Sequence, residues 1–282
     1  MTFLSRNYGL EFEVGNEVAQ DKISDIISLN SSKSVITTSK WAQSINNNYW
    51  HVKYDSTCGV AGKSIDFGWE VATFKASGDQ DLLDICRVAN SLLQIGCKVN
   101  NNCGFHIHAD VSDFSIKEMG SLLKRWIKIE DFLLKAVPER RRNNFHCLSI
   151  KKSFESKKIR NYSDESVWLS LKPRILRSHN NPDKRYTLNL VNYTKYIKAK
   201  IRTKVRPTIE FRLPEGTLNF VDIYFWTCFY LNFINYSKNH DIKNINSIKT
   251  LKQFYKISGI SSLKNEDIKI WFEQRIKKFS SN

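Results

Sequence analysis

Three short segments of the chain alternate between polar and apolar residues, and this alternation is the strongest constraint on the fold. Side chains two positions apart on a β-strand point to the same face of a sheet. Each segment therefore predicts a strand with one apolar face and one face that carries two polar groups. The segments are YGLEFEV (8–14) with Glu11 and Glu13, CGFHIHAD (103–110) with His106 and His108, and RPTIEFRLP (206–214) with Glu210 and Arg212. Charged groups are costly to bury unless opposite charges lie among them, so we expect this polar face to be the functional site.

The composition fits a folded protein with a sizeable core. The chain has 282 residues, of which 41% are hydrophobic and 12% aromatic, enough for one large domain or two closely packed ones. Its net charge of +16 attracts anions, which include nucleotides, acidic peptides, nucleic acid and anionic membranes. Most lysines and arginines are dispersed along the chain, a pattern that is typical of a solvated surface rather than a binding stripe.

The cysteines and the apolar stretches indicate the compartment. The six cysteines show no C-x-x-C spacing, which favours reduced thiols in the cytoplasm. The first residues enter a predicted strand without a preceding apolar region, so we expect no secretory signal. The most apolar stretch, 220–234, is interrupted by Asp222 and Asn232 and is too short to span a bilayer. We therefore expect a buried helix there and no association with a membrane.

Periodicity along the chain predicts an α+β fold. Strands and helices do not alternate one for one, and no glycine-rich phosphate loop is present, so the pattern favours an antiparallel or mixed sheet with one open face over a doubly wound parallel sheet. The predicted strands are 8–14, 49–55, 65–74, 104–110, 185–192 and 207–213, and the predicted helices are 16–29, 79–95, 115–137, 248–257 and 265–279. We expect one catalytic domain over 1–240, with a long basic loop at 138–184, and a helical appendage of the same domain over 241–282.

The polar pairs contain the groups that bind hard cations. Glu11 and Glu13 lie roughly 7 Å apart on a strand face, a spacing that lets two carboxylates share cations. Glu70, in the strand IDFGWEVATF, offers a third carboxylate. His106 and His108 offer imidazoles, which bind metals when neutral and anions when protonated. For each group the alternative is an ordinary exposed residue, and for Glu210 with Arg212 it is a surface salt bridge.

Arginines accompany the carboxylates in the same strand patterns. Arg185 and Asn189 share the polar face of the strand RYTLNLVN, and Arg140 to Arg142 lie in the basic loop. The planar donors of arginine match phosphate oxygens, so arginines beside carboxylates indicate a metal–nucleotide complex. The metal ligands would be Glu11, Glu13, Glu70, His106 or His108, and Glu210, enough for two or three Mg²⁺ ions, with Mn²⁺ as a substitute. This set, with Arg185, Arg212 and the loop arginines around phosphate, is what transfer of the γ-phosphoryl group of ATP requires.

Six short motifs follow one another in a fixed order between residues 8 and 218. The motifs are Tyr8 to Val14, Trp50-x-Val52-x-x-Asp55-Ser56, the strand with Glu70, Val99-Asn100 with Cys103-Gly104-x-His106-x-His108, Arg185-Tyr186 to Asn189, and Thr208-x-Glu210-Phe211-Arg212 with Gly216-Thr217-Leu218. Together they resemble the motifs of the amidoligase family, a branch of the glutamine synthetase-like carboxylate-amine ligases.

The resemblance implies a fold and an activity. The fold would be a curved antiparallel sheet that forms an open funnel, with helices on its other face. The activity would be ATP-dependent joining of a carboxylate to an amine through an acyl phosphate, on an amino acid or a peptide. Carried over to this sequence, the metal ligands are Glu11, Glu13, Glu70, His106 or His108, and Glu210; the nucleotide-binding residues are Arg185, Asn189, Arg212, His108 and Arg141; and the catalytic residues are Arg185 and Arg212, with Glu215 as a candidate base.

The chain also departs from the family pattern. Many members carry a Ser-Pro pair after the second acidic position, whereas Val71 and Ala72 follow Glu70 here. Within 138–184 the resemblance is confined to Arg141 to Cys147, and after about residue 230 there is none.

Two other functions fit part of the pattern. A guanidino kinase would use a similar sheet and arginine set, but would release a stable phosphorylated product. A metal-dependent nuclease or nucleic-acid-binding protein would account for the net charge and the paired acids. However, the chain shows no nucleic-acid-binding motif, and its aromatic residues fall in apolar patterns rather than in exposed stacking arrays.

Overall fold

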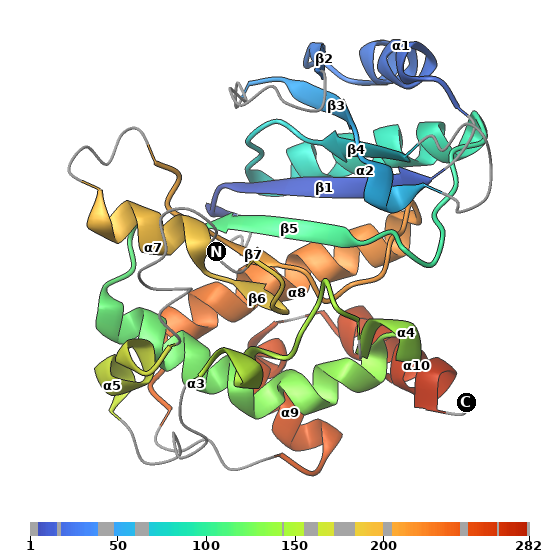
Figure 1. The fold of residues 1–282 in the computed structure, drawn as a ribbon. Coiled ribbons are helices and arrows are strands. Elements are labelled where there is room, and N and C mark those ends of the chain that lie inside the picture. Colours follow the sequence, from blue (N-terminus) through green and yellow to red (C-terminus); the bar gives the residue numbers. More distant parts are fainter. Residues whose placement is uncertain are drawn as a thin grey trace. The chain divides into compact units, whose positions relative to one another are not determined.

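The computed structural model describes residues 5–15, 18–38, 48–59, 68–142, 144–154, 163–171, 184–199, 205–242, 248–263 and 265–280. The chain folds into two compact units. The first comprises Met1–Ala109 and Pro214–Cys228, and the second comprises Asp110–Leu213 and Phe229–Asn282. Each unit contains helices and strands, which confirms the predicted α+β class (Figure 1). The predicted domain boundary near residue 240 stays a prediction.

Five strands of the first unit pair in the order β2-β3-β4-β1-β5. They are β1 (Tyr8–Gly15), β2 (Val35–Thr38), β3 (Trp50–Tyr54), β4 (Gly68–Ala72) and β5 (Phe105–Asp110). β1 pairs antiparallel with both β4 and β5, and β3 pairs antiparallel with β4. β2 pairs parallel with β3, so this part of the sheet is mixed rather than purely antiparallel. β2 is a short strand, VITT, which the sequence pattern missed.

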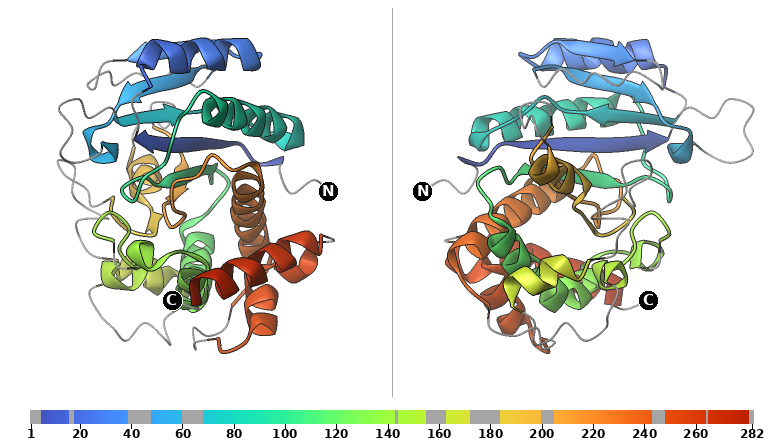
Figure 2. Two further views of the ribbon diagram at one scale, coloured as in Figure 1. Left: turned by 90° about the vertical axis from the view of Figure 1, so that its right-hand side faces the viewer. Right: turned by 60° about the vertical axis from the view of Figure 1, so that its left-hand side comes forward.

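Helices α1 (Gln20–Asn30) and α2 (Gly78–Gln94) pack against each other in the first unit (Figure 2). Leu82, Ile85 and Cys86 of α2 are fully buried, whereas Leu83 and Leu93, which the helical periodicity also places inward, are exposed. The Tyr8 hydroxyl donates a hydrogen bond to the carbonyl of Gly78 over 3.1 Å, which ties the start of β1 to the start of α2. A 3-10 turn, Ser56–Cys58, follows β3.

The second unit is mostly helical. α3 (Ile116–Leu133) begins with a capping box formed by Ser115 and Glu118, and the 3-10 turn Leu134–Ala136 follows it. β6 pairs antiparallel with β7, and Trp126 of α3 contacts Phe211 of β7. The other elements of this unit are α4 (Glu139–Arg142), a 3-10 turn (Ile150–Ser153), α5 (Asp164–Leu169), β6 (Leu188–Asn189), α7 (Val191–Lys198), β7 (Thr208–Phe211), α9 (Leu251–Ser258), a 3-10 turn (Ile260–Ser262) and α10 (Asp267–Ser280).

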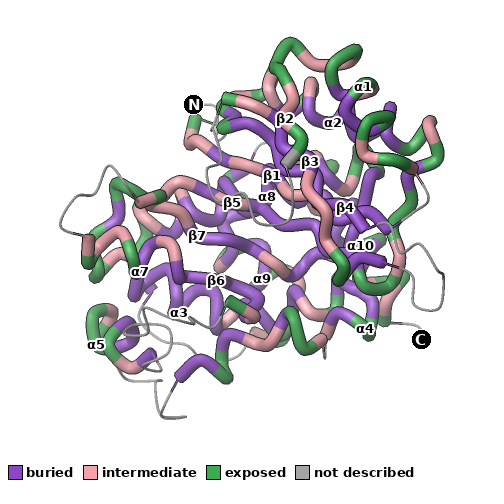
Figure 3. The backbone as a smooth tube through the Cα atoms, turned by 45° about the horizontal axis from the view of Figure 1, so that its top comes forward, coloured by how far each residue is buried: buried purple, intermediate pink, exposed green. Residues whose placement is uncertain are grey.

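Helix α8 (Phe220–Asn239) supplies residues to both units. Its buried residues confirm the predicted core helix at 220–234, and they include Trp226, Phe229 and Ile234, all 0% exposed. Among the residues that the structure describes, no helix combines the length and the apolar character that crossing a bilayer needs. The tube in Figure 3 shows how far α8 is buried in comparison with the exposed surface of α1.

The structure also differs from the sequence prediction in three other segments. The predicted loop at 138–184 contains α4, the 3-10 turn Ile150–Ser153 and α5. The strand predicted at 185–192 is only Leu188–Asn189, because α7 begins at Val191. The Asn189 side chain accepts a hydrogen bond from the amide of Val191 over 3.0 Å, which ends the extended run. The helix predicted at 16–29 begins later, at Gln20, and Asn16 and Glu17 lie outside the described residues.

Candidate active site

Four neighbouring strands of the first unit carry polar side chains on one face. The pairing register places Glu11 opposite His106 and places Glu13 opposite Glu70. Glu70 in turn lies opposite Lys53 on β3. Directly opposed residues of antiparallel strands point to the same side of the sheet. We call this set the carboxylate face; its members are Glu11, Glu13, Lys53, Glu70, His106 and His108.

The opposite side of the same strands is apolar. Tyr8, Leu10, Phe12 and Val14 of β1 are at most 2% exposed. Phe12 stacks on Phe105 of β5 with 5.3 Å between the ring centroids. The alternation of the first two segments therefore has the predicted consequence: one side enters the core, and the other side assembles charged groups.

The imidazole of His106 lies between two carboxylates. Its Nδ1 atom is 3.4 Å from Oε2 of Glu11, and its Nε2 atom is 3.6 Å from Oε1 of Glu13. His108 lies on the other side of Glu11, with Nε2 2.9 Å from Oε1. The second oxygen of Glu13, Oε2, accepts a hydrogen bond from the amide of Gly104 over 2.5 Å. The carboxylates are thus held by fixed neighbours, which orients them before any ligand binds.

Neighbouring charges shift the pKa values of this face in opposite directions. Burial alone would raise the pKa of Glu11, but His108 and His106 outweigh burial and hold that pKa well below its usual range. Burial and the charge of Glu11 raise the pKa of Glu70 to about 8, although Lys53 acts against this shift. Acids so crowded that one resists ionisation favour a bound cation.

Lys53 is the member of the carboxylate face that sequence reasoning missed. Its ammonium Nζ lies 2.5 Å from Oε1 of Glu70. Burial would lower the pKa of Lys53, but the charges of Glu70 and Glu11 raise it above its usual value. The alternation in YWHVKYD does place Lys53 on the polar side of its strand, so a signal was present. The alternation does not show that this strand, β3, pairs with β4.

A second group of possible ligands lies at the end of β3. Glu13, Asp55 and Cys58 each offer one ligand atom, and these atoms lie within 4.8 Å of one another. Asp55 also accepts hydrogen bonds at Oδ1 from the amide and the hydroxyl of Thr57, over 2.8 and 2.7 Å. Gly68 allows this close arrangement, because a Cβ atom there would lie 2.0 Å from the carbonyl oxygen of Asp55.

The second unit brings together three of the predicted residues. Asn189 lies opposite Glu210 in the β6–β7 pair, and its Nδ2 atom donates to Oε2 of Glu210 over 2.6 Å. The Nη1 atom of Arg212 forms an ion pair with Oε1 of Glu210. Glu210 is only 6% exposed, so both of its oxygens are held in place. We call these three residues the acid–guanidinium cluster.

Arg141 binds the backbone of the acid–guanidinium cluster. It is only 2% exposed, and its guanidinium donates from Nη2 to the carbonyl of Arg212 over 2.5 Å and from Nε to that of Leu213 over 3.3 Å. The thiol of Cys147 donates to the same Arg212 carbonyl over 3.2 Å. Arg141 was predicted to bind nucleotide, but the donors described here bind the backbone at the end of β7. The neighbouring Arg140 is exposed.

Two other predicted residues, Arg185 and Glu215, belong to different units. The guanidinium of Arg185 in the second unit lies over the ring of Phe145, 4.1 Å from its centroid, and Phe145 is 61% exposed. Glu215 belongs to the first unit, where it forms a β-bridge with Gly104. Glu215 is thus paired with the residue whose amide donates a hydrogen bond to Glu13.

These features define a class of protein. It is an α+β protein in which one sheet face presents carboxylates and imidazoles suited to a cation, and in which an arginine is fixed by a buried acid. The model of the family described as "Putative amidoligase enzyme" matches residues 4–234 of the chain. The chain therefore belongs to this family, whose name denotes a ligase that forms amide bonds. No curated protein matches the chain. The match ends inside α8, in agreement with the expected loss of resemblance after about residue 230.

Proposed function

We propose that this chain is an ATP- and Mg²⁺-dependent carboxylate-amine ligase that joins an acid to an amine, on an amino acid or a peptide, through an acyl phosphate. The observation that carries the proposal is the carboxylate face, where three acids and two histidines lie on adjacent strands of one sheet. Membership of the amidoligase family supports the same reaction class. The proposal also includes a sheet that forms a glutamine synthetase-like funnel and a cytoplasmic location of the protein.

The donor set of the carboxylate face fits Mg²⁺ or Mn²⁺. Glu11, Glu13 and Glu70 offer hard carboxylate oxygens, and His106 adds an imidazole nitrogen. An ammonium group already lies 2.5 Å from Glu70, so the acids accept a cation at this place. In the second unit, Glu210 is proposed as a metal ligand, and Asn189 and Arg212 hold its two oxygens in place. When bound, the metal ions would neutralise phosphate oxygens, and the proposed ligands are enough for two or three ions.

The arginines are assigned to the transferring phosphoryl group. Arg212 and Arg185 neutralise the charge that spreads over this group in the transition state. Asn189 and His108 contact the nucleotide phosphates in this scheme. Arg141 acts indirectly, by holding the carbonyl of Arg212. Glu215 is assigned as the base that removes a proton from the attacking amine.

The proposed reaction has two steps. An oxygen of the substrate carboxylate attacks the γ-phosphorus of ATP, the bond to the β-phosphate oxygen breaks, and ADP leaves. The amine nitrogen then attacks the acyl carbon, the bond to the phosphate oxygen breaks, and Glu215 takes the amine proton. The products are an amide, ADP and inorganic phosphate.

The direct test is a screen for ADP release with ATP, Mg²⁺ and mixtures of carboxylates, amines and peptides, followed by mass analysis of the products. We expect a product lighter than its two substrates by one water, formed together with ADP and phosphate. A phosphorylated product without free phosphate would instead identify a kinase of the guanidino type.

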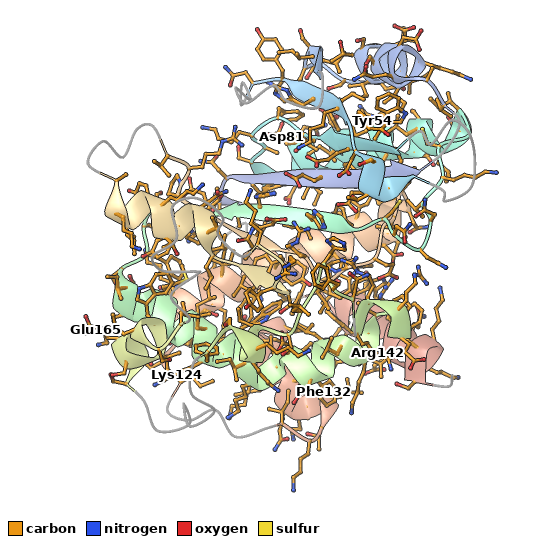
Figure 4. The ribbon with its side chains drawn as sticks, in the orientation of Figure 1. Tyr54, Asp81, Lys124, Phe132, Arg142 and Glu165 are labelled. Atoms are coloured by element: carbon orange, nitrogen blue, oxygen red, sulfur yellow. The ribbon has the colours of Figure 1, made fainter. Side chains whose placement is uncertain are left out.

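A matched pair of variants connects the activity to the site. Glu13→Gln should abolish ADP release, because it removes a charge from the face while an amide oxygen can still accept the Gly104 hydrogen bond. Glu165→Gln changes an exposed acid on α5, labelled in Figure 4, and should leave turnover unchanged. Equal turnover in both variants would remove the carboxylate face from the reaction.

A further inference from the structure

We propose that Lys53 is the resident counter-cation of the carboxylate face, and that a divalent metal ion must displace it from Glu70 in order to bind. The inference rests on the metal site of the proposed function and adds a residue that controls the affinity of that site. Lys53 lies on β3, directly opposite Glu70 on β4, and its Nζ atom is 2.5 Å from Oε1 of Glu70.

The surroundings of this ion pair are acidic on the side of β1. Glu13 lies opposite Glu70 in the register, on the strand next to β4. Glu11 and Asp55 also act electrostatically on Lys53. Of the six residues that form the carboxylate face, Lys53 alone carries a permanent positive charge. Its ammonium therefore occupies the place where several negative charges favour a cation.

The two partners differ in their freedom to move. The side chain of Lys53 is 32% exposed, whereas that of Glu70 is 12% exposed. Lysine has four rotatable methylene groups and can carry its charged end into water without moving the backbone. Glu70 lies in the middle of a paired strand and cannot follow. Exchange of the ammonium for a metal ion is therefore possible without refolding the strand.

Metal titration of variants tests this exchange. Binding of Mn²⁺, without nucleotide, would be measured by calorimetry for wild type, Lys53→Met and Lys53→Arg. We expect Lys53→Met to bind Mn²⁺ at least about tenfold more tightly than wild type, because the ion no longer competes with an ammonium. Lys53→Arg keeps the charge and should stay close to wild type. Lys22→Met removes an exposed charge from α1 of the same unit and should change nothing.

A labelling experiment on the wild-type protein gives a second readout. Reductive methylation followed by peptide mass spectrometry measures how fast each lysine reacts. Saturating Mg²⁺ should speed the methylation of Lys53, because the displaced amine leaves its ion pair, while the rate at Lys22 stays constant. This experiment decides the question if Lys53→Met does not fold.

The outcomes separate this inference from the proposed function. If wild type binds Mn²⁺ but Lys53→Met binds it no more tightly, Lys53 is not a competitor and the metal site stands. Unchanged or slower methylation of Lys53 at saturating Mg²⁺ would overturn the inference in the same way. If neither wild type nor Lys53→Met binds Mn²⁺, the metal site itself is wrong, and the proposed function loses its main support.

Discussion

His106 on β5 lies directly across from Glu11 on β1, with 3.4 Å between Nδ1 and Oε2. The other ring nitrogen lies 3.6 Å from Oε1 of Glu13, so one imidazole orients both carboxylates of the first strand. Only 3% of His106 is exposed, which prevents water from taking over these contacts. The histidine thus acts on the acids whether or not it also binds a metal ion.

The first prediction concerns this orientation. His106→Gln should weaken Mn²⁺ binding and slow ADP release by roughly 10- to 100-fold, because groups that orient metal ligands have effects of this size. Calorimetry and the ADP assay measure the two quantities. His240→Gln, at an exposed residue directly after α8, is the control. Metal affinity equal to that of wild type would show that the acids need no orienting imidazole.

The second prediction concerns the shape of the Arg212 donor group. Arg212→Lys keeps the positive charge but loses the planar fork that contacts Glu210. We expect kcat to fall on the order of 10²-fold, the usual effect of removing one donor to a developing charge. Steady-state ADP release at saturating ATP measures kcat. Arg140→Lys provides an exposed arginine for comparison, and equal kcat values for the two variants would exclude a special role of the fork.

The third prediction separates support from ligand binding at Arg141. Arg141→Met leaves the carbonyls of Arg212 and Leu213 without their guanidinium donor. The free energy of unfolding should fall by roughly 2–4 kcal/mol, since each buried acceptor left unpaired is destabilising. Urea unfolding measures this change. A fully stable variant that no longer binds ATP would instead support the nucleotide-binding role that the sequence predicted.

The fourth prediction concerns pH and the buried acid Glu130 of α3. Glu130 is 0% exposed and accepts hydrogen bonds from the Ser149 hydroxyl over 2.5 Å and the Ile150 amide over 2.8 Å. Burial raises the pKa of Glu130 above its usual value in spite of these donors. The folded state therefore keeps this proton to a higher pH than the unfolded state does. The contribution of Glu130 to stability is present below the unfolded pKa and is lost as the pH rises through the folded pKa.

Glu130→Gln should remove this pH dependence, because an amide does not titrate. Relative to wild type, the variant should become more stable as the pH rises above the usual range for glutamate. Urea midpoints at several pH values measure the difference between the two proteins. For Glu165→Gln, on the surface of α5, the difference in urea midpoint from wild type should be the same at every pH. A Glu130→Gln curve that also runs parallel would show that the carboxyl group does not titrate in this window.

The positions of the strands in the site could be predicted from the sequence, but the register in which they pair could not. Alternation from Tyr8 to Val14 identified β1 and its two faces, since a period of two residues is a local property. It did not show that Glu11 lies opposite His106, because register depends on how distant segments pair. For the same reason the ion pair of Lys53 with Glu70 could not be predicted.

Two further differences arose from tertiary contacts. The alternation in RYTLNLVN continues past Asn189, but the Asn189 side chain binds the amide of Val191 and a helix begins there. Arg140, Arg141 and Arg142 look equivalent in the sequence. Only the fold shows that Arg141 is buried on backbone carbonyls.

Each compact unit is assembled from two stretches that are distant in the chain, Met1–Ala109 with Pro214–Cys228 and Asp110–Leu213 with Phe229–Asn282. As a result, a protease that nicks the backbone at one point always leaves at least one unit built from two fragments. Any continuous fragment of the chain that contains the whole of one unit therefore also contains part of the other unit.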